Sequence, residues 1–133
     1  MSENGANDEY LSVDTNVRHF QTIRFAQLTV FIAILGGLLS LLFTFASGLP
    51  TWLSLSLKVG GLAITILFWI LQERTMVYWN HFVRLAAQLE KGLGYRQYST
   101  RPRQGFVSGT NAIRGFFLVV CLFWVAAMIW SPL

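Results

Sequence analysis

Three apolar stretches dominate the pattern of the chain, at residues 25–47, 52–72 and 113–130. The first has no charged side chain. As a helix it would be about 34 Å long, against about 30 Å for the hydrocarbon core of a bilayer. An acidic segment precedes it, and it is longer than the roughly 7–15 apolar residues of a signal peptide. The pattern therefore predicts three membrane-spanning helices.

A short segment at residues 48–51 separates the first two apolar stretches. It contains Gly48, which favours the end of a helix, and Pro50, which favours the beginning of the next one. We therefore expect the first two spans to form a tight hairpin.

Residues 73–93 continue the second stretch with helical periodicity. One stripe is apolar: Tyr78, Phe82, Leu85, Leu89 and Leu93. The opposite face is polar and is a candidate cytoplasmic interaction face: Asn80, His81, Arg84, Gln88 and Lys91. The apolar stripe could pack against the N-terminal helix of the same chain, against a second subunit or partner, or against lipid. Glu90 is expected at a solvated or paired helix surface.

These patterns predict an all-α, three-span helical membrane protein consisting of a single membrane domain. We expect a disordered tail at 1–13 and a helix with the first span at 14–47, capped by Ser12 or Asp14. The second span and its amphipathic continuation form one helix at 52–93. A cytoplasmic loop at 94–112 and a third span at 113–131 complete the chain.

Composition and charge support a membrane location. Hydrophobic residues make up 54% of the chain and charged residues 12%, and the mean hydropathy is +0.52. Soluble domains have about 25% charged residues. The net charge is +4, and seven of the ten basic residues lie within 73–114. The positive-inside rule then predicts a multi-pass protein of the inner (plasma) membrane, with a cytoplasmic N-terminus and an external C-terminus.

Basic residues near the span ends and in the predicted loop at 94–112 are candidates for contacts with anionic lipid headgroups. They are Arg74, Arg96, Arg101, Arg103 and Arg114. Arginines and aromatic residues alternate in 95–106, as in some RNA-binding patches. Headgroup contact explains the same residues, so we expect no nucleic-acid partner.

Lys58 is a charged residue within the second predicted span. A lysine at the bilayer centre costs about 2.5–3.5 kcal/mol, but Lys58 is only about 9 Å from the outer end of its helix. Two interpretations stay open: a side chain that extends to the interface, or a charge facing a shared lumen. Small residues also recur at helical spacing and form a candidate packing or lumen face: Gly36, Ser40, Thr44, Ser56 and Gly60. Packing of the first two spans within one chain and contact between subunits remain alternatives for this face.

The sequence shows no catalytic constellation. His19 and His81 have no cysteine or acidic cluster nearby in the sequence, and metal binding needs three or four converging ligands. Cys121 lies within an apolar stretch, where an inert thiol is expected. We therefore expect a protein that is not an enzyme and has no metal, cofactor or identifiable small-molecule substrate.

Residues 67–98 include the pair Leu89-Glu90, followed by Tyr98. This stretch resembles the helix that follows the two-span hairpin in small bacterial SLATT-type and RipA-like membrane proteins. Our chain departs from that pattern by its third span. The resemblance implies a homo-oligomeric membrane effector, such as a pore that disturbs the inner membrane during phage defence, and it implies no catalytic residue.

Two functional hypotheses follow. The chain is a homo-oligomeric channel or membrane-disrupting effector, in which Lys58, Ser40 and Thr44 face a shared lumen. Alternatively, it is an accessory or scaffold subunit that docks a cytoplasmic partner through residues 73–112.

Overall fold

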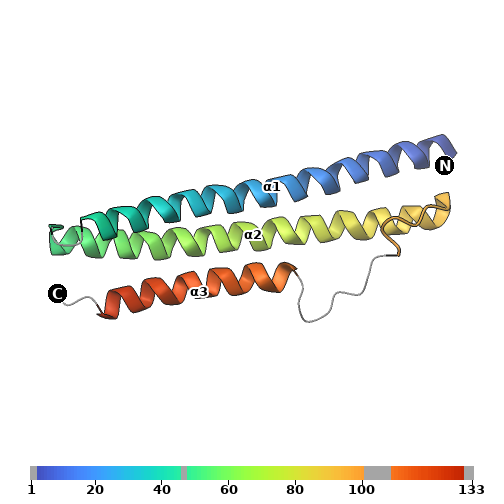
Figure 1. The fold of residues 1–133 in the computed structure, drawn as a ribbon. Helices are drawn as coiled ribbons and strands as arrows, with labels where there is room; N and C mark the ends of the chain where they lie inside the picture. Colours follow the sequence, from blue (N-terminus) through green and yellow to red (C-terminus); the bar gives the residue numbers. More distant parts are fainter. Residues whose placement is uncertain (1–2, 46–47, 101–108, 131–133) are drawn as a thin grey trace. The chain divides into compact units, whose positions relative to one another are not determined.

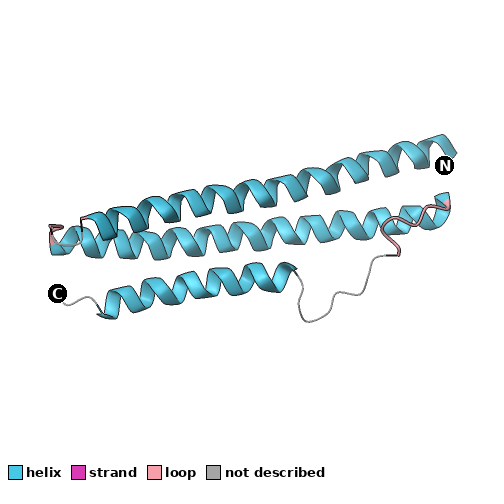
Figure 2. Ribbon diagram, viewed as in Figure 1, coloured by secondary structure: helices cyan, strands magenta, loops and turns pink. Residues whose placement is uncertain are grey.

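The computed structural model describes residues 3–45, 48–100 and 109–130. It has three helices in chain order: α1 (Glu3–Thr44), α2 (Thr51–Leu93) and α3 (Gly109–Trp130) (Figure 1). The described residues contain helices and connecting turns and no strand (Figure 2). All three helices are long and apolar enough to cross a membrane. The prediction of an all-helical chain with three such helices is confirmed.

Helix α1 begins at Glu3, so the predicted disordered tail at 1–13 is wrong from residue 3 onward. The reason is that Tyr10, Val13 and Val17 follow one another at helical spacing and are all buried. They extend the contact face of α1 toward its N-terminus. Ser12 and Asp14 are therefore inside the helix rather than at its cap.

The other predicted boundaries differ less. Helix α2 covers Thr51–Leu93, within one residue of the predicted 52–93. Before it, the carbonyl oxygen of Pro50 accepts hydrogen bonds from the backbone N–H groups of Leu53 and Ser54. Helix α3 begins at Gly109, four residues before the predicted third span. The prediction missed this first turn because its residues are small and polar rather than apolar. Residues 46–47, 101–108 and 131–133, including Arg101 and Arg103, are outside the described residues.

The chain divides into two compact units. Unit 1 comprises Met1–Ala26 and Gln72–Gln104, and unit 2 comprises Gln27–Leu71 and Gly105–Leu133. The division falls near the beginning of the first apolar stretch, at 25–47, and near the end of the second, at 52–72. Unit 2 therefore contains the apolar parts of all three helices, and unit 1 contains the more polar parts of α1 and α2.

Unit 2 has an aromatic core to which all three helices contribute. Phe31 of α1 and Phe117 of α3 have ring centroids 4.9 Å apart, and Phe31 is 5.4 Å from Phe68 of α2. Phe117 also stacks with Trp69 of α2. Phe31, Phe117, Val120 and Trp124 are buried at the centre of this cluster. Packing of this kind in lipid depends on close contact, because the lipid tails are as apolar as the side chains.

Unit 1 is a contact between two helices, α1 and α2. It is covered by the segment that follows α2, at residues 95–100. Buried residues from both helices form its core: Val17, Met76, Trp79 and Val83 in one cluster, and Tyr10, Val13 and Ala86 in another. Of the predicted apolar stripe, Phe82, Leu85, Leu89 and Leu93 pack at the edge of these clusters, whereas Tyr78 is exposed. Glu90 lies on the buried face of α2.

Candidate functional sites

A polar network in unit 1 is centred on the Glu90 carboxylate, which is completely buried. Oε1 accepts a hydrogen bond from the backbone N–H of Tyr98 at 2.8 Å, and Oε2 accepts one from the N–H of Ser99 at 2.8 Å. The hydroxyl of Tyr10 donates to Oε1 at 3.1 Å. The expectation of a solvated or surface-paired Glu90 is therefore wrong. These donors replace the water that a buried carboxylate loses.

A second contact holds the same segment to α1. The Tyr98 hydroxyl donates to Oδ1 of Asp14, and Oδ2 of Asp14 is 2.9 Å from a guanidinium nitrogen of Arg18. The backbone of Tyr98 is thus bound to α2 and its side chain to α1. The segment that follows α2 is consequently fastened to both helices of unit 1.

These contacts shift the pKa values of the groups involved. Burial by itself would raise the pKa of Glu90, but the N–H groups of Tyr98 and Ser99 and the Tyr10 hydroxyl outweigh it and leave the pKa below its ordinary value. Burial, and then the hydrogen bond to Glu90, raise the pKa of Tyr10 to about 12. Burial and the bond to Asp14 raise the pKa of Tyr98. The network therefore stabilises an ionised Glu90 and two neutral tyrosines.

The pKa directions predict how attachment of this segment depends on pH. Because the folded pKa of Glu90 is depressed, its ionised form stabilises the attached segment. This stabilisation is complete above the ordinary pKa of 4.5 and is lost as the pH falls through the lower folded pKa. Because the folded pKa of Tyr10 is raised, its neutral form also stabilises the attached segment. This stabilisation is complete below the ordinary pKa of 10.0 and is lost as the pH rises through the folded pKa of about 12. We expect the backbone amides of Tyr98 and Ser99 to be protected from hydrogen exchange between these limits, after correction for the intrinsic rate. Constant protection down to the pH at which the whole protein unfolds would contradict this.

An open pocket of about 300 Å³ lies beside this network. Its lining combines residues of α1 with residues of the attached segment: Asn7, Tyr10, Leu11, Tyr95, Arg96 and Gln97. The rings of Tyr10 and Tyr95 are 5.3 Å apart and tilted by 45°. Since Tyr95, Arg96 and Gln97 reach α1 through the segment that Glu90 fastens, the pocket depends on that carboxylate.

The predicted cytoplasmic interaction face is largely open to solvent. His81, Arg84, Gln88 and Lys91 are exposed on α2, and Asn80 is half-buried. The candidate headgroup residues Arg74, Arg96 and Arg114 are also exposed. Residues 73–93 contain two acidic side chains, of which Glu73 is half-buried and Glu90 is buried. The outer face of this part of α2 therefore presents basic side chains.

In unit 2, Lys58 is buried, with 8% of its surface exposed. It precedes the fully buried Thr65 by seven residues, which is close to two helical turns, so both side chains lie on one face of α2. Ser40 and Thr44 are exposed on α1. The three residues expected to share a lumen therefore do not lie on one exposed surface of the chain.

The predicted small-residue face does not pack within the chain. Gly36, Ser40, Thr44 and Ser56 are exposed, and Gly60 is half-buried. A Cβ atom added at Gly36 or Gly60 would meet nothing within 4 Å. Among the described residues, the first two spans therefore do not pack through this face.

Among the described residues, Gly61 makes a close contact with another helix that was not predicted from the sequence. A Cβ atom at Gly61 would lie less than 3.0 Å from three ring atoms of Trp124 on α3. The Gly61 carbonyl also accepts a 2.7 Å hydrogen bond from the hydroxyl of the buried Thr65. The Gly60-Gly61 pair was the available signal, but periodicity alone could not show which of the two glycines faces α3.

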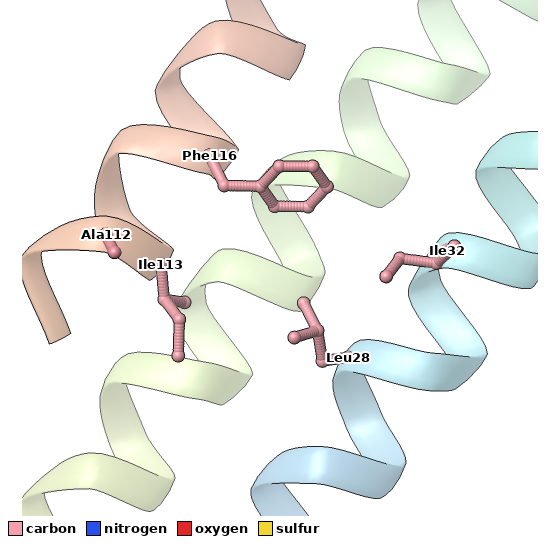
Figure 3. Close-up of a pocket in the computed structure, with 5 residues that line it drawn as sticks. All are labelled: Leu28, Ile32, Ala112, Ile113 and Phe116. Carbon is pink, nitrogen blue, oxygen red and sulfur yellow. The ribbon is translucent and has the colours of Figure 1, made fainter. Parts of the chain in front are cut away.

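Unit 2 also has an apolar pocket of about 220 Å³ between α1 and α3. Leu28 and Ile32 line it from α1, and Ala112, Ile113 and Phe116 line it from α3 (Figure 3). All five side chains are hydrocarbon. The pocket can therefore accept an apolar group but offers no side-chain hydrogen bond to a polar ligand.

Among the described residues there is no group of three or more His, Cys, Asp or Glu side chains that could hold a metal ion. His19 and His81 are exposed, and Cys121 on α3 is half-buried. Comparison of the chain with protein-family models, with curated proteins and with solved structures finds no match.

Proposed function

We propose that the chain is a non-enzymatic integral membrane protein that assembles with copies of itself in the bilayer. The observation that supports self-assembly is a row of small residues exposed along α1 in unit 2. It comprises Thr29, Ala33, Gly36, Gly37, Ser40 and Thr44. Rows of this kind allow the backbones of two membrane helices to approach closely.

The geometry of α1 places this row opposite its intramolecular contacts. An α-helix turns by about 100° per residue. Ser40, nine residues after the buried Phe31, is therefore half a turn away from the face that packs in unit 2. Exposed large residues, including Ile32 and Leu41, flank the row. A furrow of small side chains between larger ones fits a helix better than it fits mobile lipid tails.

The orientation follows as part of the same proposal. Basic residues are concentrated in 73–114, which favours a cytoplasmic location for this segment and for the N-terminus. The C-terminus would then be external. Because Lys58 is buried within the chain, we do not include a lumen lined by Lys58 in the proposal. The role of a pore-forming defence effector is supported by the resemblance of residues 67–98 to SLATT-type and RipA-like proteins.

Introducing bulk into the small-residue row tests the proposal. We expect Ser40→Leu to convert the oligomer to smaller species, because the larger side chain keeps the neighbouring helix away from the α1 backbone. The measurement is the protein mass in detergent by light scattering, with the detergent contribution subtracted. Ala126→Leu is the matched control, since Ala126 is small and exposed on α3 but outside the row. Its mass should equal that of the unmodified chain.

Two results would reject self-assembly through this row. One is a monomeric unmodified chain. The other is an oligomer whose mass Ser40→Leu leaves unchanged.

A monomer would favour a second function, which is docking of a cytoplasmic partner. The observation in its favour is the exposed basic face of α2, with Arg84 and Lys91 and without an exposed acidic residue in 73–93. A partner for this face would have an acidic surface. The chain would then act as a membrane-bound scaffold subunit.

A further inference from the structure

We infer that the copies associate side by side through unlike faces, which we call a head-to-tail contact. The outer face of α1 of one copy, opposite its intramolecular contacts, packs against the outer face of α2 of the next. This inference rests on the proposed self-assembly and specifies its geometry. It is carried by two independent matches between the outer faces, one of size in unit 2 and one of charge in unit 1.

The register of α1 and α2 in unit 2 fixes which residues lie at the same depth. The short connection from α1 to α2 makes the helices antiparallel, and the rings of Phe31 and Phe68 are 5.4 Å apart. Both helices rise by 1.5 Å per residue. Ser40, nine residues after Phe31, is therefore level with Val59, nine residues before Phe68.

The exposed faces of the two helices differ in size at four matched levels. The outer face of α2 has a ridge of large aliphatic side chains that are 44–58% exposed: Leu55, Val59, Ile66 and Ile70. By the same register they are level with exposed small residues of α1, namely Thr44, Ser40, Ala33 and Thr29 respectively. When copies are related by rotation about the membrane normal, residues that are level within one chain are also level between neighbouring copies. The ridge of one copy can therefore enter the furrow of the next at these four levels, on either side of the exposed small residue Ala63, which is level with Gly36.

Charge supports the same pairing in unit 1. The Tyr10 hydroxyl is 3.1 Å from the Glu90 carboxylate, which sets the local register of α1 and α2. Asp8 lies two residues before Tyr10 and Lys91 one residue after Glu90, so the two are nearly level. Both are exposed. An acidic side chain on α1 of one copy can thus meet a basic side chain on α2 of its neighbour.

The two faces are different surfaces of the chain, so the contact is heterologous. A heterologous contact repeated from copy to copy closes into a ring when the rotation between copies is a whole fraction of a turn, and otherwise gives an open assembly. A contact between two α1 furrows would instead be isologous and would end at a dimer. The size and charge matches favour the heterologous contact.

Cysteine cross-linking in membranes distinguishes these geometries. Two differently tagged full-length chains, both with Cys121→Ser, are co-expressed, one with Ser40→Cys and the other with Val59→Cys. We expect a covalent heterodimer as the main product. Pairing Ser40→Cys with Ile70→Cys is the out-of-register control. Ile70 is eleven residues from Val59, about 16 Å along the helix, so the heterodimer should be lost. In unit 1, Asp8→Cys with Lys91→Cys should also give the heterodimer.

The outcomes separate this inference from the proposed function. A Ser40→Cys homodimer as the main product, or equal yields from the Val59 and Ile70 pairs, would overturn the head-to-tail contact while leaving self-assembly in place. An oligomeric mass without cross-linking of the Ser40 and Val59 pair would also overturn it alone. A monomeric mass without cross-links would reject self-assembly itself, and the contact with it.

Discussion

Replacing Glu90 with glutamine is expected to detach the segment at residues 95–100 and to lower the free energy of unfolding of unit 1 by about 3 kcal/mol. The carboxylate accepts from two backbone N–H groups, those of Tyr98 and Ser99. An amide of the same size has one oxygen, and its NH₂ group would face a donor. A buried polar group left without a partner costs about 1–3 kcal/mol, and charged hydrogen bonds are stronger than neutral ones.

Hydrogen exchange of the purified protein in detergent measures this effect locally. In the Glu90→Gln variant the amides of Tyr98 and Ser99 should exchange faster, and thermal unfolding should begin at a lower temperature. Gln88→Ala is the control, because Gln88 is exposed on the same helix. Exposed substitutions usually change stability by no more than about 0.5 kcal/mol. Unchanged protection in Glu90→Gln would mean that the carboxylate does not fasten the segment.

The same substitution should remove the pocket beside Tyr10. Its lining from Tyr95, Arg96 and Gln97 reaches α1 only while the segment is attached. Asp14 would then be the remaining anchor, through the Tyr98 hydroxyl. A single side-chain hydrogen bond is a weaker restraint than the several donors that converge on the buried Glu90 carboxylate.

Glu90 illustrates what periodicity can and cannot predict. Hydrophobic spacing placed a helix over 52–93, and α2 agrees to within one residue. The same spacing treats a carboxylate as a surface residue, because its burial depends on donors eight and nine residues later that fold back onto it. Turn contacts of this kind have no periodic signature. The extended start of α1 differs in this respect, since Tyr10, Val13 and Val17 already had helical spacing in the sequence.

The small residues illustrate a second limit. The sequence showed that Gly36, Ser40 and Thr44 share one face of a helix, but a single chain does not show which neighbour that face has. In the described part of the structure these residues are exposed and are not covered by α2 or α3. The structure assigns the close intramolecular approach to Gly61, whose partner is 63 residues away on α3. Contacts between helices distant in sequence are invisible to a periodic pattern.

Gly61→Ala is expected to lower the free energy of unfolding by about 1–3 kcal/mol, which is the usual cost of overpacking. The added Cβ would lie less than 3.0 Å from three atoms of the Trp124 ring, which is completely buried and cannot move aside freely. Gly60→Ala is the matched control, because nothing lies within 4 Å of its Cβ position. That variant should gain about 0.5–1 kcal/mol from helix propensity. Unfolding in detergent, followed by circular dichroism, compares the two variants.

Shortening Trp124 should relieve the strain in Gly61→Ala. Phenylalanine has no atoms where the outer ring of the indole lies, so Trp124→Phe opens the space that the new methyl group needs. It also removes an indole N–H that has no hydrogen-bond partner among the described residues. The double variant should therefore be more stable than the sum of the single effects predicts, by 1 kcal/mol or more. Additive effects, or a Gly61→Ala variant as stable as Gly60→Ala, would show that α2 and α3 do not meet at this contact. The close approach of Gly61 to Trp124 would then not determine how the third helix packs.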